Sequence, residues 1–194
     1  MDNKIVLEWR GAFDWFGSSD NVLFRREERK FRGIYLWAVH VHNGYLTYYV
    51  GETGKTFNER MKEHASNYLS GLYRIYEPES FRAGRKVLLW QGMWQKGTED
   101  LLPDFLERYV EYAPKILDML GSLKLFVAPL DVEPRIRKRI ESSIAHCLYN
   151  KSKPICDFQE TEIRYARRSS SEEPFIVENV LQEDIFGLDK MLRA

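Results

Sequence analysis

Arg60 and His64 stand four residues apart in a polar stretch of the chain, and both side chains can act on a phosphate group. Residues at positions i and i+4 lie on one face of an α-helix, so we expect the two side chains to be neighbours. A guanidinium can bind two phosphate oxygens at once, and an imidazole can exchange protons near neutral pH. Taken alone, Arg60 is explained more simply by a surface ion pair with Glu59 or Glu63.

Glu141 is the carboxylate best placed for metal chemistry. It lies in a stretch that Pro134 opens, with an apolar stripe at helical spacing formed by Ile136, Ile140, Ile144 and Cys147 or Leu148. Glu141 borders that stripe, and a half-buried carboxylate must find a partner. Mg²⁺ is held through one or two protein carboxylates plus substrate phosphate oxygens, so a single Glu is sufficient.

A β-hairpin followed by a helix would position the first pair of residues. Gly33–Val41 is a nearly unbroken apolar and aromatic run, Leu46–Gly51 is a second, and Asn43-Gly44 between them is a strong turn signal. From Phe57 onward, apolar residues recur every three or four positions over about 15 residues, which predicts an amphipathic helix. The expected order is therefore strand, strand, helix, with Arg60 and His64 on the helix.

Other chemistries fit the sequence poorly. The stretch Gly51–Thr56 suggests a phosphate-binding P-loop, but only two residues separate its glycines, where that loop needs four. His40 and His42 would share one strand face, yet no third metal ligand is evident nearby. The cysteines, Cys147 and Cys156, form neither a disulfide framework nor a structural zinc site.

The remainder of the chain adds further elements. Leu123–Ala128 predicts a short buried strand, and Lys86–Trp90 is a possible one. Leu101–Leu120 has helical periodicity, interrupted by Pro114. Near the C-terminus, Glu162–Ala166 and Phe175–Val180 are strand-like.

These motifs together resemble those of the GIY-YIG nuclease family. The resemblance rests on Gly33–Tyr35, Tyr49–Thr53, Arg60–His64 and Glu141, and it resumes at Pro154–Asp157. It covers about half of the chain. Asp157 stands where the family usually has Asn, so its support of the site is an open question.

The resemblance implies one α/β domain spanning residues 1–194, with a small mixed β-sheet flanked by helices. Its β-β-α-β-α core would comprise about 31–70 and 122–158. A large helical insertion, about 71–121, would interrupt the core and serve either specificity or scaffolding. An N-terminal arm, 1–30, and a C-terminal extension, 159–194, complete the expected organisation.

The resemblance also implies an activity, the hydrolysis of DNA phosphodiesters with Mg²⁺ or Mn²⁺ bound at Glu141. The expected catalytic residues are Tyr35, Tyr49, Arg60, His64 and Glu141, with Tyr35 as general base. A free-standing chain of this length favours a restriction or defence endonuclease acting on duplex DNA, and we allow for a homodimer. The alternative is a non-catalytic module that keeps the scaffold and binds nucleic acid or a protein.

The spacing of the two tyrosines predicts a detail of the hairpin. A strict two-residue loop at Asn43-Gly44 would place Tyr35 and Tyr49 on opposite faces of the sheet. We therefore predict either a three-residue loop over 42–44 or a bulge at Gly44. Either would pair Trp37 with Tyr49 and Tyr35 with Gly51, so that both tyrosines share a face.

Charge and composition limit the partners. The chain has 29 Lys and Arg against 29 Asp and Glu, so any nucleic-acid-binding surface must be local. The basic residues expected to contact nucleic acid are Arg25, Arg26, Lys55, Arg135, Arg137 and Arg139. No apolar stretch suits a membrane span and the N-terminus has no signal-peptide pattern, so we expect a cytoplasmic protein.

Overall fold

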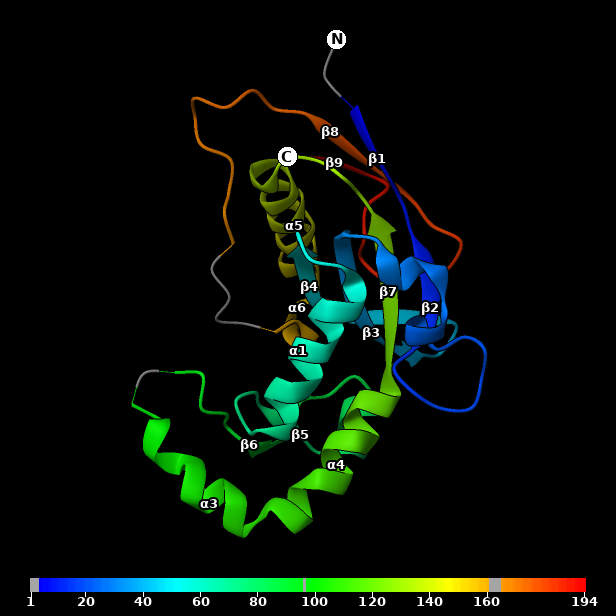
Figure 1. Cartoon of the computed structure of the whole chain (residues 1–194). Helices are drawn as coiled ribbons and strands as arrows, with labels where there is room; N and C mark the ends of the chain where they lie inside the picture. The colour runs from blue at the N-terminus through cyan, green and yellow to red at the C-terminus, as the bar shows by residue number, and fades with distance from the viewer. Residues whose placement is uncertain (1–3, 96, 161–164) are drawn as a thin grey trace.

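A four-stranded antiparallel sheet forms the centre of the molecule (Figure 1). The computed structural model describes residues 4–95, 97–160 and 165–194. Across the sheet the strands are ordered β2 (Arg10–Asp14), β7 (Leu123–Pro129), β3 (Gly33–Val41) and β4 (Gly44–Thr53). The α/β class is confirmed, but this sheet is not mixed, because each neighbouring pair runs antiparallel.

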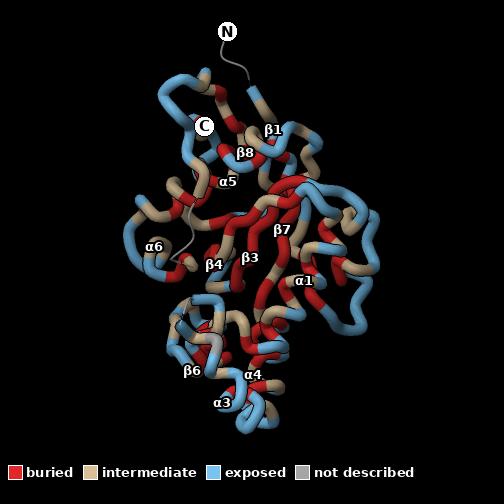
Figure 2. The backbone as a smooth tube through the Cα atoms, turned by 60° about the vertical axis from the view of Figure 1, so that its left-hand side comes forward, coloured by how far each residue is buried: buried red, intermediate tan, exposed pale blue. Residues whose placement is uncertain are grey.

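The two faces of β3 belong to two different cores. Tyr35 and Trp37 face the core that contains α1 (Phe57–Leu69), whereas Ile34 and Leu36 face the core that contains α5 (Pro134–Tyr149). Successive side chains of a strand point to opposite faces, and β3 is apolar on both, so each face is covered by a helix. Figure 2 shows β3 and β7 as the most continuously buried part of the chain.

The local sequence explains where both helices begin. At the start of α1, the Thr56 side chain accepts a hydrogen bond from the Glu59 backbone and the Glu59 carboxylate accepts one from the Thr56 backbone, which is a capping box. Pro134 opens α5 at a position where its missing N–H is not needed. The predictions of helices from Phe57 and from Pro134 are confirmed.

The hairpin register agrees with the prediction, but the cause is different. Tyr35 pairs with Gly51 and Trp37 pairs with Tyr49. The turn is a two-residue loop at 42–43, and the bulge lies at Tyr48, not at Gly44. The extra residue at Tyr48 shifts the alternation by one, which returns Tyr49 to the face of Tyr35.

The insertion forms the lower part of the molecule in Figure 1 and is only partly helical. Its helix break lies at Arg108, and Pro114 lies inside a helix. The prediction of a strand over 86–90 is confirmed in part by β6. The elements of this segment are β5 (Ile75–Tyr76), α2 (Pro78–Arg82), β6 (Leu88–Trp90), η3 (Glu99–Leu101), α3 (Leu102–Glu107) and α4 (Tyr109–Ser122).

The N-terminal arm and the C-terminal extension meet in a second sheet, at the top of Figure 1. In it β1 (Lys4–Glu8) pairs in parallel with β8 (Ile176–Val180), and β9 (Met191–Arg193) pairs with the other edge of β8. The predicted strand at 175–180 is thereby confirmed, whereas most of the one at 162–166 lies outside the described residues. The arm also supplies β2 to the central sheet, which the sequence did not indicate.

Three short elements complete the chain, namely η1 (Leu23–Arg25), η2 (Glu27–Lys30) and α6 (Ile155–Phe158). Within the described ranges, none of the helices has the length and apolar character needed to span a bilayer.

Candidate active site

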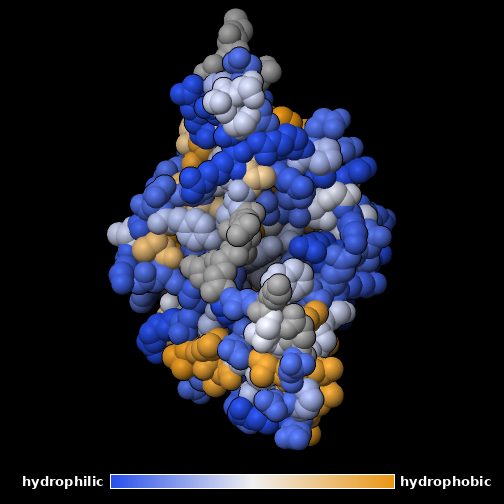
Figure 3. Space-filling view, turned by 90° about the vertical axis from the view of Figure 1, so that its left-hand side faces the viewer, coloured by the Kyte–Doolittle hydropathy of each residue, from blue (hydrophilic) through white to orange (hydrophobic). Residues whose placement is uncertain are grey.

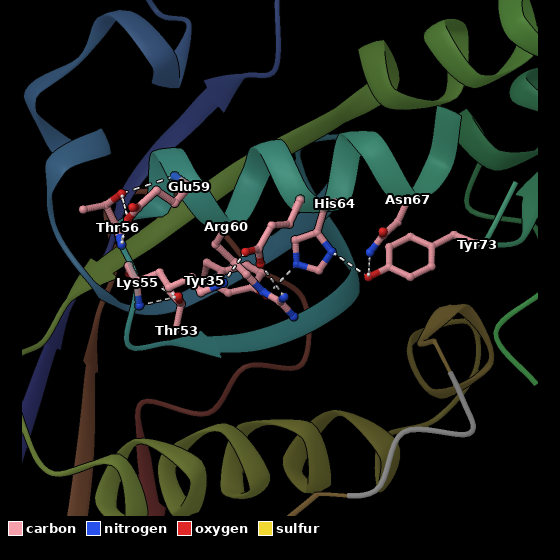
Figure 4. Close-up of polar contacts among 10 residues, drawn as sticks. Tyr35, Thr53, Lys55, Thr56, Glu59, Arg60, His64, Asn67 and Tyr73 are labelled. Carbon is pink, nitrogen blue, oxygen red and sulfur yellow. Dashed lines mark hydrogen bonds and ion pairs between the residues drawn. The ribbon is translucent and has the colours of Figure 1, made fainter. Parts of the chain in front are cut away.

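A buried polar network joins α1 to the middle of β3. The Tyr35 hydroxyl accepts a hydrogen bond from Arg60 Nε at 3.2 Å and lies 2.8 Å from His64 Nε2. Tyr35 and His64 are almost entirely buried, while Arg60 is partly exposed. Figure 4 shows Arg60 and His64 projecting from the same face of α1 toward Tyr35, as the i, i+4 spacing predicts.

The network continues from His64 toward the insertion. His64 Nδ1 lies 3.1 Å from the Tyr73 hydroxyl, which also accepts a hydrogen bond of 3.0 Å from Asn67 Nδ2. If Tyr35 donates its proton to Nε2, then Nδ1 carries a hydrogen and donates to Tyr73; in the other tautomer Nε2 donates to Tyr35 and Tyr73 donates to Nδ1. His64 is neutral in both arrangements.

Burial controls the protonation of this network. It raises the pKa of Tyr35 well above the ordinary value near 10, and although the Arg60 charge opposes that rise, it does not cancel it. Burial, aided by the Arg60 charge, lowers the pKa of His64 well below 6.5. Without a ligand, Tyr35 is therefore a neutral phenol and His64 a neutral imidazole at physiological pH.

Glu141 reaches the same region from α5, on the other side of the sheet edge. Its Oε1 accepts a hydrogen bond of 3.0 Å from the Glu52 backbone N–H at the end of β4. Burial raises the pKa of Glu141 to about 7, the Glu52 charge contributes to that rise, and the Arg60 charge opposes it. This carboxyl group is held where its charge is costly unless a cation comes close.

Tyr49 lies between these groups. Its ring centre is 5.9 Å from that of Tyr35 and 5.8 Å from that of His64. Burial and then the Glu141 charge raise the pKa of Tyr49 to about 12, and Arg60 opposes this. The five predicted catalytic residues thus come together from β3, β4, α1 and α5.

A cavity of about 490 Å³ opens beside this cluster. Tyr49, Arg60, His64, Asn67 and Tyr73 line it on the side of the network. The other lining residues come from the hairpin, α1, the insertion and the segment after α6, and they are Trp37, Tyr48, Tyr68, Leu72, Arg74, Gln91, Trp94, Gln95 and Glu160.

The basic residues expected to bind nucleic acid do not gather at this cavity. Lys55 is exposed and forms an ion pair with Glu63, which also pairs with Arg60 at 3.1 Å. The ion pair with Glu63 that Arg60 alone would suggest is therefore present, and the same side chain also contacts Tyr35. Arg25 and Arg26 are exposed at η1 and η2, where Arg25 Nη1 donates to the Ser19 carbonyl at 2.9 Å.

The expectation of a basic surface at 135–139 needs correction. Arg137 is 5% exposed and donates to Glu52 Oε2 at 3.0 Å and to the Val132 carbonyl at 2.6 Å. Arg139 is 4% exposed and donates to the carbonyls of Glu173 and Ala194. These two guanidinium groups stabilise the fold and are not presented to a ligand.

Arg135 is also engaged within the chain. It forms two hydrogen bonds of 2.6 Å with the Glu172 carboxylate, and the pair lowers the pKa of Glu172 to about 2. Asp157 does not join the site either, because it is exposed on α6 and forms an ion pair of 3.0 Å with Lys153.

Sequence reasoning missed two members of the network. Asn67 follows His64 by three residues and Arg60 by seven, so helical spacing alone indicates that it shares their face. Tyr73 follows the end of α1, and no periodicity marks it. Its position depends on the chain turning back at Gly71, where φ is +74°.

The candidate residues fit a divalent cation in a limited way. In the part of the chain that the structure describes, no group of three or more His, Cys, Asp or Glu side chains is arranged to hold a metal. Mg²⁺ does not require one, because it keeps several waters and takes the rest of its ligands from substrate phosphate. Glu141, whose pKa burial raises, offers the kind of oxygen that such an ion prefers.

No family model matches this chain, and no curated protein or solved structure matches it either.

Proposed function

We propose that the protein hydrolyses phosphodiester bonds of DNA with the help of a divalent cation. The observation that carries the proposal is the clustering of Tyr35, Tyr49, Arg60, His64 and Glu141, three of which, Tyr49, Arg60 and His64, line one cavity. The resemblance to GIY-YIG nuclease motifs names these five residues in separate segments of the sequence. That they meet in space supports that resemblance.

Arg60 would bind the phosphate group of the substrate. Its Nε is occupied by Tyr35 and its Nη1 by Glu63, so its guanidinium is held in a fixed orientation at the cavity wall. A phosphate that enters the cavity meets a cation which needs little reorganisation. Such preorganised charge is most effective on the oxygens that become more negative in the transition state.

Tyr35 and His64 can receive the proton of an attacking water. Tyr35 accepts that proton on its oxygen while its own proton passes to His64 Nε2, 2.8 Å away. A bound phosphate brings negative charge, which raises the pKa of His64 and makes the transfer easier. Tyr73 then accepts a hydrogen bond from Nδ1 of the protonated ring.

Glu141 is the residue for Mg²⁺ or Mn²⁺, which when bound would stabilise charge on the phosphate and the leaving oxygen. The carboxyl group must be deprotonated for this role, and its pKa of about 7 means that proton and cation compete at neutral pH. Its hydrogen bond from the Glu52 backbone fixes its orientation in either state.

Incubation of purified protein with plasmid DNA tests the proposal. We expect cleavage with Mg²⁺ or Mn²⁺, no cleavage with EDTA, and no cleavage by Glu141→Gln. Asp118→Asn, an exposed carboxylate on α4, is the matched control and should cleave normally. Binding of DNA without cleavage under any of these conditions would instead favour the non-catalytic module.

A further inference from the structure

The cavity extends well beyond the catalytic cluster, toward the insertion. Its floor contains Trp37, Tyr48 and Tyr68, which are almost fully buried aromatic residues. Its rim is formed by Gln91, Trp94 and other residues of the loop that follows β6. None of these side chains has a task in the hydrolysis described above.

The rim is held firmly by its backbone. Gly92 has a φ of +80°, and a Cβ at this position would lie 2.7 Å from the Leu72 carbonyl oxygen. Met93 N–H donates to that same carbonyl at 3.0 Å. Only glycine allows this close approach, so the loop is fixed against the segment that carries Tyr73.

Trp94 stands at the mouth of the cavity with 72% of its surface exposed. Its ring meets the Tyr73 ring edge to face, with centres 5.8 Å apart. Figure 3 shows that apolar residues gather on this side of the molecule over the insertion. A large, exposed aromatic side chain is suited to stacking on a flat ligand.

The polar groups of the cavity suit the edge of such a ligand. Gln91 belongs to the cavity lining, and a side-chain amide can donate and accept at once, as base recognition requires. At the inner wall, Arg74 Nη1 donates to Glu160 Oε1 at 3.2 Å. A volume of about 490 Å³ is within the range of small-molecule sites, roughly 300–1,000 Å³.

We propose that this part of the cavity binds a nucleobase that has left the base stack, next to the phosphate under attack. The inference rests on the proposed function and specifies its substrate contact. Arg60 and Trp94 line one and the same cavity, and a nucleotide joins phosphate and base through a single sugar. Enzymes that remove a base from the stack hold it between aromatic side chains and contact its edge with polar groups.

Photocrosslinking tests the assignment directly. The probes are duplex and single-stranded oligonucleotides of mixed sequence in which 5-iododeoxyuridine replaces thymidine. They are bound to Glu141→Gln in EDTA, so that the DNA stays intact, and the crosslinked residues are mapped by mass spectrometry. We expect crosslinks at Trp94 or Tyr73. Crosslinks confined to residues outside the cavity would overturn the proposal.

A matched pair of variants gives a second test. Trp94→Ala should weaken oligonucleotide binding about tenfold, because a stacking contact is lost. Phe16→Ala removes another exposed aromatic ring, 49% exposed and not part of the cavity lining, and should bind as the wild type does. Equal affinities for Trp94→Ala and the wild type would overturn the base site.

The proposed function and the base site fail in different ways. If the wild type cleaves plasmid DNA while the crosslinks lie elsewhere, only the base site is wrong. If the protein neither binds nor cleaves any of the DNA probes, both are wrong.

Discussion

The two helices that cover the central sheet use their polar side chains for opposite purposes. On α1, Arg60 and His64 face the cavity and bond to Tyr35. On α5, Arg137 and Arg139 are buried and bond to a carboxylate and to backbone carbonyls of distant segments. Residue type alone therefore says little about function, since arginine serves a candidate site on one helix and the fold on the other.

The arginines of the two helices differ in the groups to which they bond. The α5 arginines bond to backbone carbonyls and to the Glu52 carboxylate. The α1 network consists of hydroxyl and imidazole groups that satisfy one another and can pass protons along the chain Tyr35, His64, Tyr73. Glu141 is the α5 residue that belongs with the α1 set, because its pKa responds to Arg60 and its charge acts on Tyr49.

Substitution of Glu141 should have the largest effect on the contrast between catalytic and structural side chains. If this residue serves catalysis and not the fold, Glu141→Gln should reduce the single-turnover cleavage rate by about 10³-fold or more. DNA affinity measured in EDTA should stay within about twofold of the wild type, since Glu141 makes no favourable contact with a phosphate unless a cation is present.

The same variant should stabilise the fold, with a definite pH dependence. The folded pKa of about 7 lies above the ordinary 4.5, so the folded state binds the proton more tightly, and wild-type stability falls as the pH rises through this window. The Gln side chain of Glu141→Gln does not ionise, so the stability of this variant should not fall in that pH range. In EDTA we expect urea unfolding to show a gain of about 3 kcal/mol at pH 8 and almost none at pH 4.5. A loss of stability at pH 8 would contradict this account.

Tyr35 is the next test, because it is the point at which the α1 network meets the sheet. Tyr35→Phe keeps the ring packing and removes only the hydroxyl that contacts Arg60 and His64. The single-turnover rate should fall by roughly 10² to 10⁴, the range of general-base assistance. The single-turnover rate of Tyr49→Phe should fall by a smaller factor. A wild-type rate for Tyr35→Phe would exclude the hydroxyl as base and leave His64 as the next candidate.

Arg60→Ala and Arg137→Ala compare the two helices directly. Arg60→Ala should lower the cleavage rate about 10²-fold and cost about 1 kcal/mol of stability or less, since it is partly exposed. Arg137→Ala should leave the Glu52 carboxylate half-buried without its ion pair and cost about 3 kcal/mol. Denaturation and single-turnover assays on both variants would show the reversed pattern if our assignment of the two arginines were wrong.

The parts of the fold that local pattern controls could be predicted from the sequence. The hairpin strands, α1, β7 and α5 follow from apolar periodicity and from turn and cap residues, and the shared face of Tyr35 and Tyr49 follows from parity. The bulge at Tyr48 could not be located, because a bulge anywhere between the two tyrosines has the same effect on parity.

Long-range contacts account for the rest. The burial of Arg137 and Arg139 depends on Glu52 and on the C-terminal residues, which are far away in the sequence. The placement of Tyr73 and Trp94 depends on Gly71 and Gly92 turning the insertion back against α1. A run of basic residues looks the same in the sequence whether it forms a solvent-exposed face or contains buried arginines that bond to distant segments.

Tyr73→Phe should give the smallest effect and the sharpest test of the proton path. The variant leaves His64 Nδ1 and Asn67 Nδ2 without their shared partner, while Tyr35 keeps its contacts with Arg60 and His64. We expect the single-turnover rate to fall about tenfold with DNA affinity unchanged, because Tyr73 is a positioning residue that helps set the imidazole tautomer. The ¹⁵N chemical shifts of His64 report the two tautomers directly, and their ratio should change in Tyr73→Phe but not in the control Tyr109→Phe, which lies on α4 away from the cavity lining. An unchanged rate together with an unchanged tautomer ratio would end the network at His64 and make Tyr73 a packing residue of the insertion.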